Sequence, residues 1–236
     1  MTAGDDLREA VWRANLALVR DGLVTLSFGN ASGVDRERGV LVIKPSGVPY
    51  ADLRPQDLVE VAIEDGRVLG GSLRPSSDTP THLALVRRYP SVGGVVHTHS
   101  TAATAWAQAH RAIPPLGTTH ADHFRGPVPV TRDLRSDEIA GAYEALTGSV
   151  IVETLDGLGL DAEAMPAVLV ASHGPFTWGR DAREAVEAAV ALELVATMAE
   201  QTLALAPSIG PIADDLLERH FTRKHGPGAT YGQGGR

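Results

Sequence analysis

Short apolar segments, each about the length of one β-strand, recur along the chain between stretches with helical periodicity. Residues 58–71 also read as a hairpin, because apolar and polar side chains alternate before an Asp65-Gly66 dipeptide that favours a tight turn. The other strand-like segments are residues 23–28, 40–43, 92–99, 150–154 and 167–172. Strands that occur in clusters and also alternate with helices favour a sheet covered by helices over a barrel.

Helical periodicity is clearest in two long segments. Residues 5–20 repeat apolar positions at helical spacing, and a second helix is expected from Asp181, as its N-cap, to about Leu205, with Glu184 completing a capping box. Further helices are expected at residues 80–88, at 101–108, and at 212–225 before Gly226-Pro227-Gly228. We therefore predict an α/β protein with one domain over residues 1–236 and a central mixed, largely antiparallel sheet.

Composition excludes several classes of function. The chain has no cysteine, so a metal would have to be held by His, Asp or Glu. The net charge is -8 and no Lys/Arg run stands out, which argues against a nucleic-acid partner. The N-terminus does not resemble a signal peptide, and no apolar stretch reaches the roughly 18 uncharged residues of a membrane span. A soluble, cytoplasmic protein is the expectation.

Histidines follow two of the predicted strands. His97 and His99 stand two positions apart after an apolar run, so in an extended strand their imidazoles point to the same face. His173 follows a second apolar run, in ASHGPFTWG, and would supply the third ligand of a metal site. The alternative is that histidines at a strand end are simply surface residues. Asp78 offers a hard oxygen ligand, or else is an ordinary helix N-cap.

Three segments rich in small residues could bind phosphate. Ser76 and Ser77 stand before a predicted helix N-terminus, where free amides and the helix dipole favour an anion. Lys44 can add a positive charge. The segments are SFGNASG, KPSG and PSS. Each alone is a generic turn sequence, and their occurrence together is what suggests a phosphate site.

Taken together, these segments resemble the class II aldolase/epimerase family over nearly the whole chain. The matching motifs also include SSDTPTHLAL, GGVVHTHSTAATAWAQ, GTTHADHF and RKHGPGATYGQ. The resemblance implies a three-layer class II aldolase-like fold and a cyclic homotetramer. It further implies that the active sites lie between subunits, and that the Gly-rich tail, residues 226–236, reaches a neighbouring subunit.

The resemblance also implies roles for individual residues. The zinc ligands would be Asp78, His97, His99 and His173. The substrate and phosphate contacts would be Gly29, Asn30, Lys44, Ser46, Gly47, Ser76 and Ser77, with Thr118 and His220 lining the site. Asp122 and Tyr231 match the two proton-transfer residues. A site of three histidines and one aspartate could equally hold manganese or cobalt.

The activity that the resemblance implies is epimerisation of L-ribulose 5-phosphate at C4 to give D-xylulose 5-phosphate, by a zinc-assisted retro-aldol route. The alternative within the family is an aldolase of the fuculose- or rhamnulose-phosphate type. Those aldolases usually carry Glu where this chain has Asp78, and they differ around GTTHAD. An adducin-like interaction module without chemistry would be expected to lose metal ligands, whereas all four are present.

Overall fold

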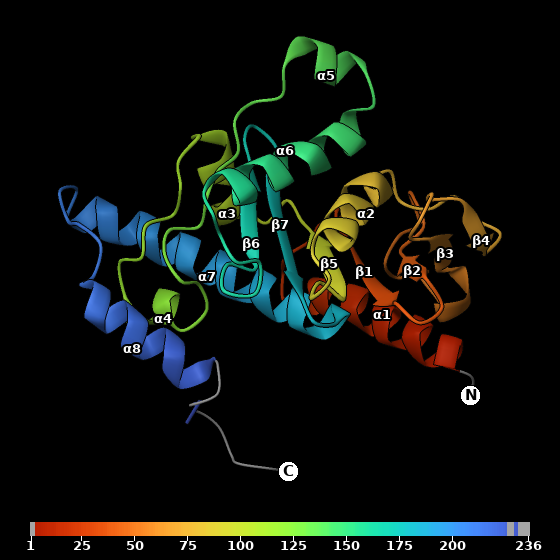
Figure 1. Ribbon diagram of the computed structural model, residues 1–236, viewed down its shortest axis with the longest axis horizontal. Helices are drawn as coiled ribbons and strands as arrows, with labels where there is room; N and C mark the ends of the chain where they lie inside the picture. Colours follow the sequence, from red (N-terminus) through yellow and green to blue (C-terminus); the bar gives the residue numbers. More distant parts are fainter. Residues whose placement is uncertain (1–2, 226–228, 231–236) are drawn as a thin grey trace.

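One seven-stranded sheet with the strand order β4-β3-β2-β1-β5-β7-β6 forms the centre of the protein (Figure 1). The computed structural model describes residues 3–225, 229 and 230. The strands are β1 Asn30–Asp35, β2 Val40–Ile43, β3 Val59–Ala62, β4 Val68–Gly70, β5 Gly94–His97, β6 Ala167–Val170 and β7 Gly174–Gly179. The predicted sheet is confirmed, and its neighbouring strands are all antiparallel; a parallel contact occurs as an isolated bridge between Val130 and Leu169.

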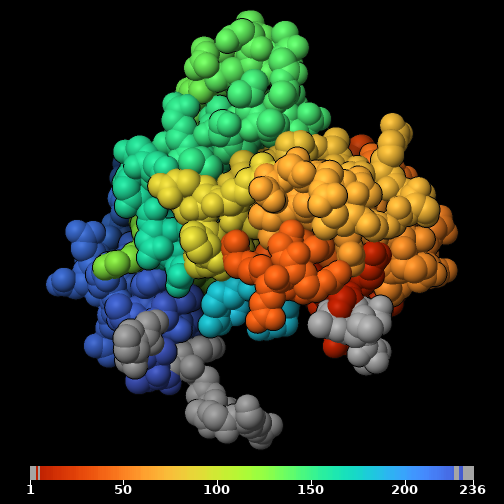
Figure 2. Space-filling model, turned by 45° about the vertical axis from the view of Figure 1, so that its right-hand side comes forward, coloured from red at the N-terminus to blue at the C-terminus, as the bar shows by residue number. Residues whose placement is uncertain are grey.

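Helices cover both faces of this sheet. Leu41 and Ile43 belong to a core shared with α2 and α6, while their neighbours Val40 and Val42 pack with α1 and α7. This alternation of side chains along β2 produces the three layers (Figure 1). The helices are α1 Ala3–Arg20, α2 Thr79–Arg88, α3 Thr101–Gln108, α4 Thr118–Ala121, α5 Ser136–Ala140, α6 Tyr143–Gly157, α7 Ala182–Leu205 and α8 Asp214–Lys224, with a 3-10 turn η1 at Pro55–Asp57. The segment around α5 projects from the body (Figure 2).

Helix α7 is long and apolar enough to span a membrane by length and composition alone. In its most apolar 18-residue stretch 33% of the residues are buried, and Ala185, Val186 and Ala189 pack against α1 and the sheet. Asp181 caps the helix as predicted, with Oδ1 accepting the Glu184 N–H at 2.8 Å. The Glu184 carboxylate, however, accepts from the N–H of Arg180 rather than from that of the cap residue.

Two predicted strands are wrong. Residues 150–154 lie within α6, because Val150, Ile151 and Leu155 are the positions that this helix buries. Their β-branched composition indicated a strand, but packing against α2 decides the conformation. Residues 23–28 form a loop, in which Leu26 has a left-handed backbone (φ 60°) that interrupts an extended chain.

Two adjacent glycines fix the strand that carries His97. A Cβ on Gly93 would lie 2.0 Å from the carbonyl oxygen of Arg180, and one on Gly94 would lie 2.4 Å from the amide nitrogen of Ala182. The backbone of β5 therefore packs directly on the start of α7. The strand ends at His97, two residues earlier than predicted.

The predicted end of the last helix at Gly226-Pro227-Gly228 lies outside the described residues.

Candidate active site

The three predicted histidine ligands converge at the ends of neighbouring strands. His97 is the last residue of β5, His99 lies two residues beyond it, and His173 lies in the turn between β6 and β7. The Nε2 atoms of His97 and His99 are 3.1 Å apart, and one ligand atom from each histidine lies within 4.8 Å of the other two. The convergence that the spacing predicted is confirmed, although His99 stands just beyond the strand itself.

Hydrogen bonds and packing orient two of these rings. His97 Nδ1 lies 2.9 Å from the carbonyl oxygen of Pro175, and its ring stacks on Phe176 with centroids 4.2 Å apart. His173 Nδ1 lies 3.5 Å from the hydroxyl of Tyr143. In each ring the Nδ1 atom has a partner, so Nε2 is the atom that can face a metal. Burial lowers the pKa of His97 to about 3, so this imidazole is neutral at pH 7 and keeps a lone pair for coordination.

Asp78 stands at the N-cap position of α2, but its side chain makes no cap hydrogen bond. Its Oδ2 instead accepts from Asn30 Nδ2 at 2.7 Å and lies 3.4 Å from Ser76 Oγ. The capping alternative therefore fails, and the carboxylate lines the same pocket as the histidines. It is not one of the ligand atoms that lie within 4.8 Å of one another in the described part of the chain.

The three segments predicted to bind phosphate meet beside the histidines. They line a pocket of about 320 Å³ with Gly29, Asn30, Lys44, Ser46, Gly47, Ser76, Ser77, Asp78, His97, His99 and His173. Gly29 and Gly47 have left-handed backbones (φ 76° and 71°), which glycine adopts without strain. Within residues 3–225, the N–H groups of Gly29, Gly47 and Ser77 have no acceptor among the backbone bonds of the loops, so each remains a donor for a ligand.

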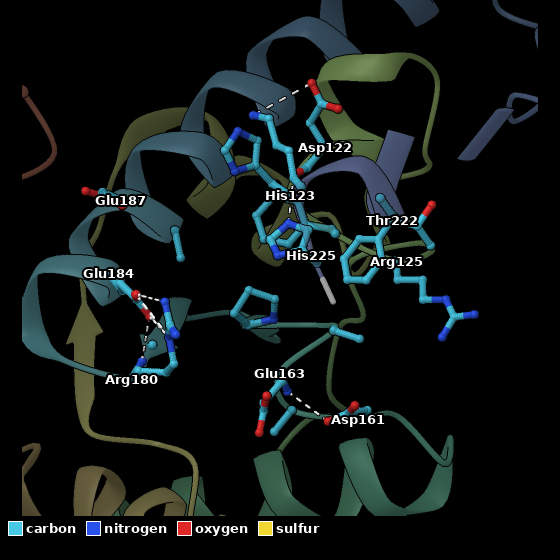
Figure 3. Close-up of a pocket in the computed structure, with 18 of the residues that line it drawn as sticks. Asp122, His123, Arg125, Asp161, Glu163, Arg180, Glu184, Glu187, Thr222 and His225 are labelled. Atoms are coloured by element: carbon cyan, nitrogen blue, oxygen red, sulfur yellow. Dashed lines mark hydrogen bonds and ion pairs between the residues drawn. The ribbon is translucent and has the colours of Figure 1, made fainter. Parts of the chain in front are cut away.

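The remaining predicted site residues are not brought to this pocket. Thr118 begins α4, and Asp122 and His220 line a separate pocket of about 1440 Å³. The start of α7, with Glu184 and Glu187, lies across this pocket from Asp122 (Figure 3). Tyr231 lies outside the described residues. Within one chain, the three histidines and the small-residue segments therefore lie together in one pocket, and Asp122 lies in another.

Asp122 is tightly held by α8. His220 Nδ1 lies 3.0 Å from Oδ1, and the Arg223 guanidinium donates to both carboxylate oxygens, at 3.1 and 2.8 Å. Burial alone would raise the pKa of Asp122, but the hydrogen bonds from Arg223 and His220 outweigh it and lower the pKa below its ordinary value. The carboxylate is therefore ionised at neutral pH.

Two residues of the histidine pocket were missed in the sequence. Tyr143 and Glu144 open α6 and line the pocket beside His173. Nothing in the local pattern distinguished them, because this helix was not predicted and its later part was read as a strand. A search for a helix start among residues 141–145 could have found them.

Residues 2–199 match the description "Class II Aldolase and Adducin N-terminal domain". The chain is 56% identical over 227 residues to an L-ribulose-5-phosphate 4-epimerase, UlaF, of Salmonella paratyphi C (strain RKS4594), covering 96% of this chain and 98% of the relative. UlaF of Salmonella choleraesuis (strain SC-B67) is also 56% identical to this chain, and the match covers the same shares of both chains.

Solved structures agree in fold. An L-fuculose 1-phosphate aldolase superposes with a TM-score of 0.77 at 22% identity, covering 94% of this chain and 97% of that one. YgbL of Klebsiella pneumoniae, described as a putative aldolase/epimerase/decarboxylase, superposes with a TM-score of 0.72 at 27% identity, covering 93% and 99%. With the three-layer fold, the histidine cluster and a family match over most of its length, the chain belongs to the class II aldolase/adducin family.

Proposed function

We propose that this protein is a metal-dependent L-ribulose-5-phosphate 4-epimerase. The observation that carries the proposal is the position of three converging histidines beside a pocket wall of unpaired amides and a buried lysine. The high identity to UlaF over nearly the full length of both chains supports this substrate over those of other family members. The substrate would be a small phosphorylated ketose, held with its phosphate on the amides and its carbonyl toward the histidines.

The donor set fits a divalent cation. His97, His99 and His173 would hold it through nitrogen, and Asp78, which lines the same pocket, would be the fourth donor. Zinc is the expected ion, although manganese or cobalt would suit the same ligands. When bound, such an ion supplies Lewis acidity that polarises the substrate carbonyl and stabilises developing negative charge.

The chain's own residues would control what happens at C4. The C4 hydrogen is not acidic, so inversion requires that the C3–C4 bond break and re-form on the opposite face of the aldehyde. The phosphate-bearing fragment must turn without leaving the site. Lys44, Ser46 and Ser77 would retain it through the phosphate, which is why we expect an unphosphorylated sugar to react poorly.

Proton transfer at the C4 oxygen needs two groups, which we assign to Asp122 and Tyr231. In a single chain Asp122 lines the other pocket, so the proposal requires that a neighbouring subunit bring its Asp122, and its C-terminal tail with Tyr231, to this chain's histidines. We accordingly propose a homotetramer with shared sites, in which Thr118 and His220 approach the substrate from the neighbour.

A coupled assay tests the activity. L-ribulose 5-phosphate should be converted to D-xylulose 5-phosphate, and chelation of the metal should abolish turnover. Release of a free aldehyde and dihydroxyacetone phosphate from a ketose 1-phosphate would instead identify an aldolase. Similar kcat/KM for L-ribulose and its 5-phosphate would contradict the role given to the phosphate pocket.

Subunit mixing tests the shared site. His99→Ala removes a metal ligand and Tyr231→Phe removes the phenol, so each parent should be inactive or nearly so. If the two functions come from different chains, random co-assembly in a cyclic oligomer should restore roughly a quarter of the sites. Mixtures that are unfolded and refolded together and remain as inactive as the parents would show that Tyr231 does not act in a neighbour's site.

A further inference from the structure

A buried tyrosine lies directly behind the phosphate pocket. Tyr50, in the segment that follows β2, is 6% exposed, and its hydroxyl lies 2.8 Å from the carbonyl oxygen of Gly29 and 3.1 Å from that of Phe28. The Nζ of Lys44 lies 4.8 Å from the centroid of its ring. We propose that Tyr50 is a positioning residue that sets both the Phe28–Gly29 backbone and the Lys44 ammonium for binding a phosphate; this rests on the proposed function.

The hydroxyl acts on the backbone of the pocket wall. In a trans peptide the C=O and the N–H point in opposite directions, so fixing the Phe28 carbonyl on Tyr50 turns the Gly29 N–H away from Tyr50. Gly29 itself lines the pocket, and this N–H has no backbone acceptor in the described part of the chain. On its other side the segment is tightly packed, because a Cβ on Gly29 would lie 2.7 Å from the carbonyl oxygen of His97.

The ring acts on Lys44. This side chain is 2% exposed, and within residues 3–225 its Nζ donates one hydrogen bond, a long one of 3.5 Å to the carbonyl oxygen of Pro45. No carboxylate lies within ion-pair distance of Nζ among residues 3–225. The face of an aromatic ring attracts a cation within about 6 Å of its centroid, so Tyr50 stabilises the ammonium form.

An aromatic partner suits an anion site better than a carboxylate would. A carboxylate beside Lys44 would neutralise its charge and repel an incoming phosphate, whereas the ring leaves the full positive charge available. Burial, together with the charge of Asp78, raises the pKa of Tyr50, so the phenol stays protonated and remains a hydrogen-bond donor at neutral pH.

Calorimetric titration of the metal-loaded protein with inorganic phosphate tests the proposal. Tyr50→Phe removes the hydroxyl and leaves the ring in place, and loss of one buried hydrogen bond should raise the phosphate Kd about 3- to 10-fold. The KM for the sugar phosphate should rise by a similar factor, while kcat changes less than about twofold and the metal affinity is unchanged. Tyr50→Leu, which also removes the ring under Lys44, should raise the phosphate Kd further.

Tyr89→Phe is the matched control. Tyr89 is also buried, and its hydroxyl donates to Asp156 at 3.0 Å, outside the phosphate pocket. Both Phe variants should lower the Tm by a few degrees, but only the change at Tyr50 should alter phosphate affinity. A merely structural role would lower the Tm without changing how much phosphate raises it. The increase in Tm on adding saturating phosphate is therefore measured for each variant as a second readout.

The outcomes separate this inference from the proposed function. A phosphate Kd and a sugar-phosphate KM for Tyr50→Phe equal to those of the wild type would overturn the role of Tyr50 and leave the phosphate pocket intact. A wild-type protein that binds no phosphate, or a Lys44→Met variant that binds it as well as the wild type, would instead overturn the pocket assigned under the proposed function.

Discussion

Gly174→Ala should weaken the metal site with little change elsewhere. Gly174 follows His173 and begins β7. A Cβ at this position would lie 2.8 Å from the carbonyl oxygen of Thr98 and 3.7 Å from Cε1 of His97. The new methyl group would therefore press on the segment between His97 and His99 from the first residue of β7, next to His173.

The structure sets the size of the effect. Ordinary contact begins near 3.4 Å, so the Thr98 carbonyl and the first residue of β7 must separate by about 0.6 Å. Relieving an overpacked contact of this kind typically costs about 1–3 kcal/mol. Coordination tolerates distances only within about 0.2 Å of ideal, so part of this separation must be reversed when the metal binds. We expect about a tenfold loss of metal affinity, equivalent to about 1.4 kcal/mol.

The assay is titration of metal-free protein with Co²⁺, followed by its visible absorption in the presence of a competing chelator. Gly179→Ala is the control, because its Cβ would lie 2.5 Å from the Cβ of Glu184, at the opposite end of the same strand. Both variants should lose stability in urea, but only Gly174→Ala should lose Co²⁺ affinity. Equal Co²⁺ affinity in the two variants would refute the reasoning.

Three further predictions concern single side chains. His99→Ala should purify with much less than one metal ion per chain, measured by atomic absorption, because it deletes one of three converging ligands. Asp122→Asn should keep its metal while kcat falls by about two to four decades in the coupled assay; a near-normal kcat would show that another group transfers the proton. Burial and neighbouring Lys224 lower the pKa of His123 in the folded protein to about 4. As the pH falls, His123 is therefore protonated in the unfolded chain before it is protonated in the folded protein, so the free energy of unfolding should decrease from pH 6.5 toward pH 4. In urea unfolding, the free energy of unfolding of His123→Gln should decrease less between pH 6.5 and pH 4 than that of the wild type. Identical pH profiles would contradict this prediction.

Most of the fold could be predicted because local signals agreed with the packing. The Asp65-Gly66 turn lies in the hairpin of β3 and β4, and Asp181 caps α7. The failures occurred where tertiary contacts override composition. Residues 150–154 are helical because Gly148 allows α6 to approach α2, where a Cβ would lie 2.6 Å from that of Ala84. No pattern within α6 alone contains that information.

The candidate site, like the fold, could be predicted only in part. The histidine pair was predictable because His97 and His99 are neighbours in sequence, and His173 followed a recognisable strand. The orientation of Asp78 was not predictable, because an aspartate that caps a helix and one that accepts a hydrogen bond from Asn30 look the same in a sequence. The separation of Asp122 from the histidines depends on how α4 and α8 pack, which no single segment specifies.

The position of His97 has a consequence for local unfolding around the three histidines. β5 is hydrogen-bonded on both sides, with His97 opposite Asn30 of β1 and Phe176 of β7. Amides in such a strand exchange with solvent only in the larger unfolding events, whereas those in the loop that holds His99 and the turn that holds His173 exchange through local opening. A bound metal should therefore slow deuterium uptake mainly in this loop and this turn, whereas uptake by the β5 amides near His97 should change little.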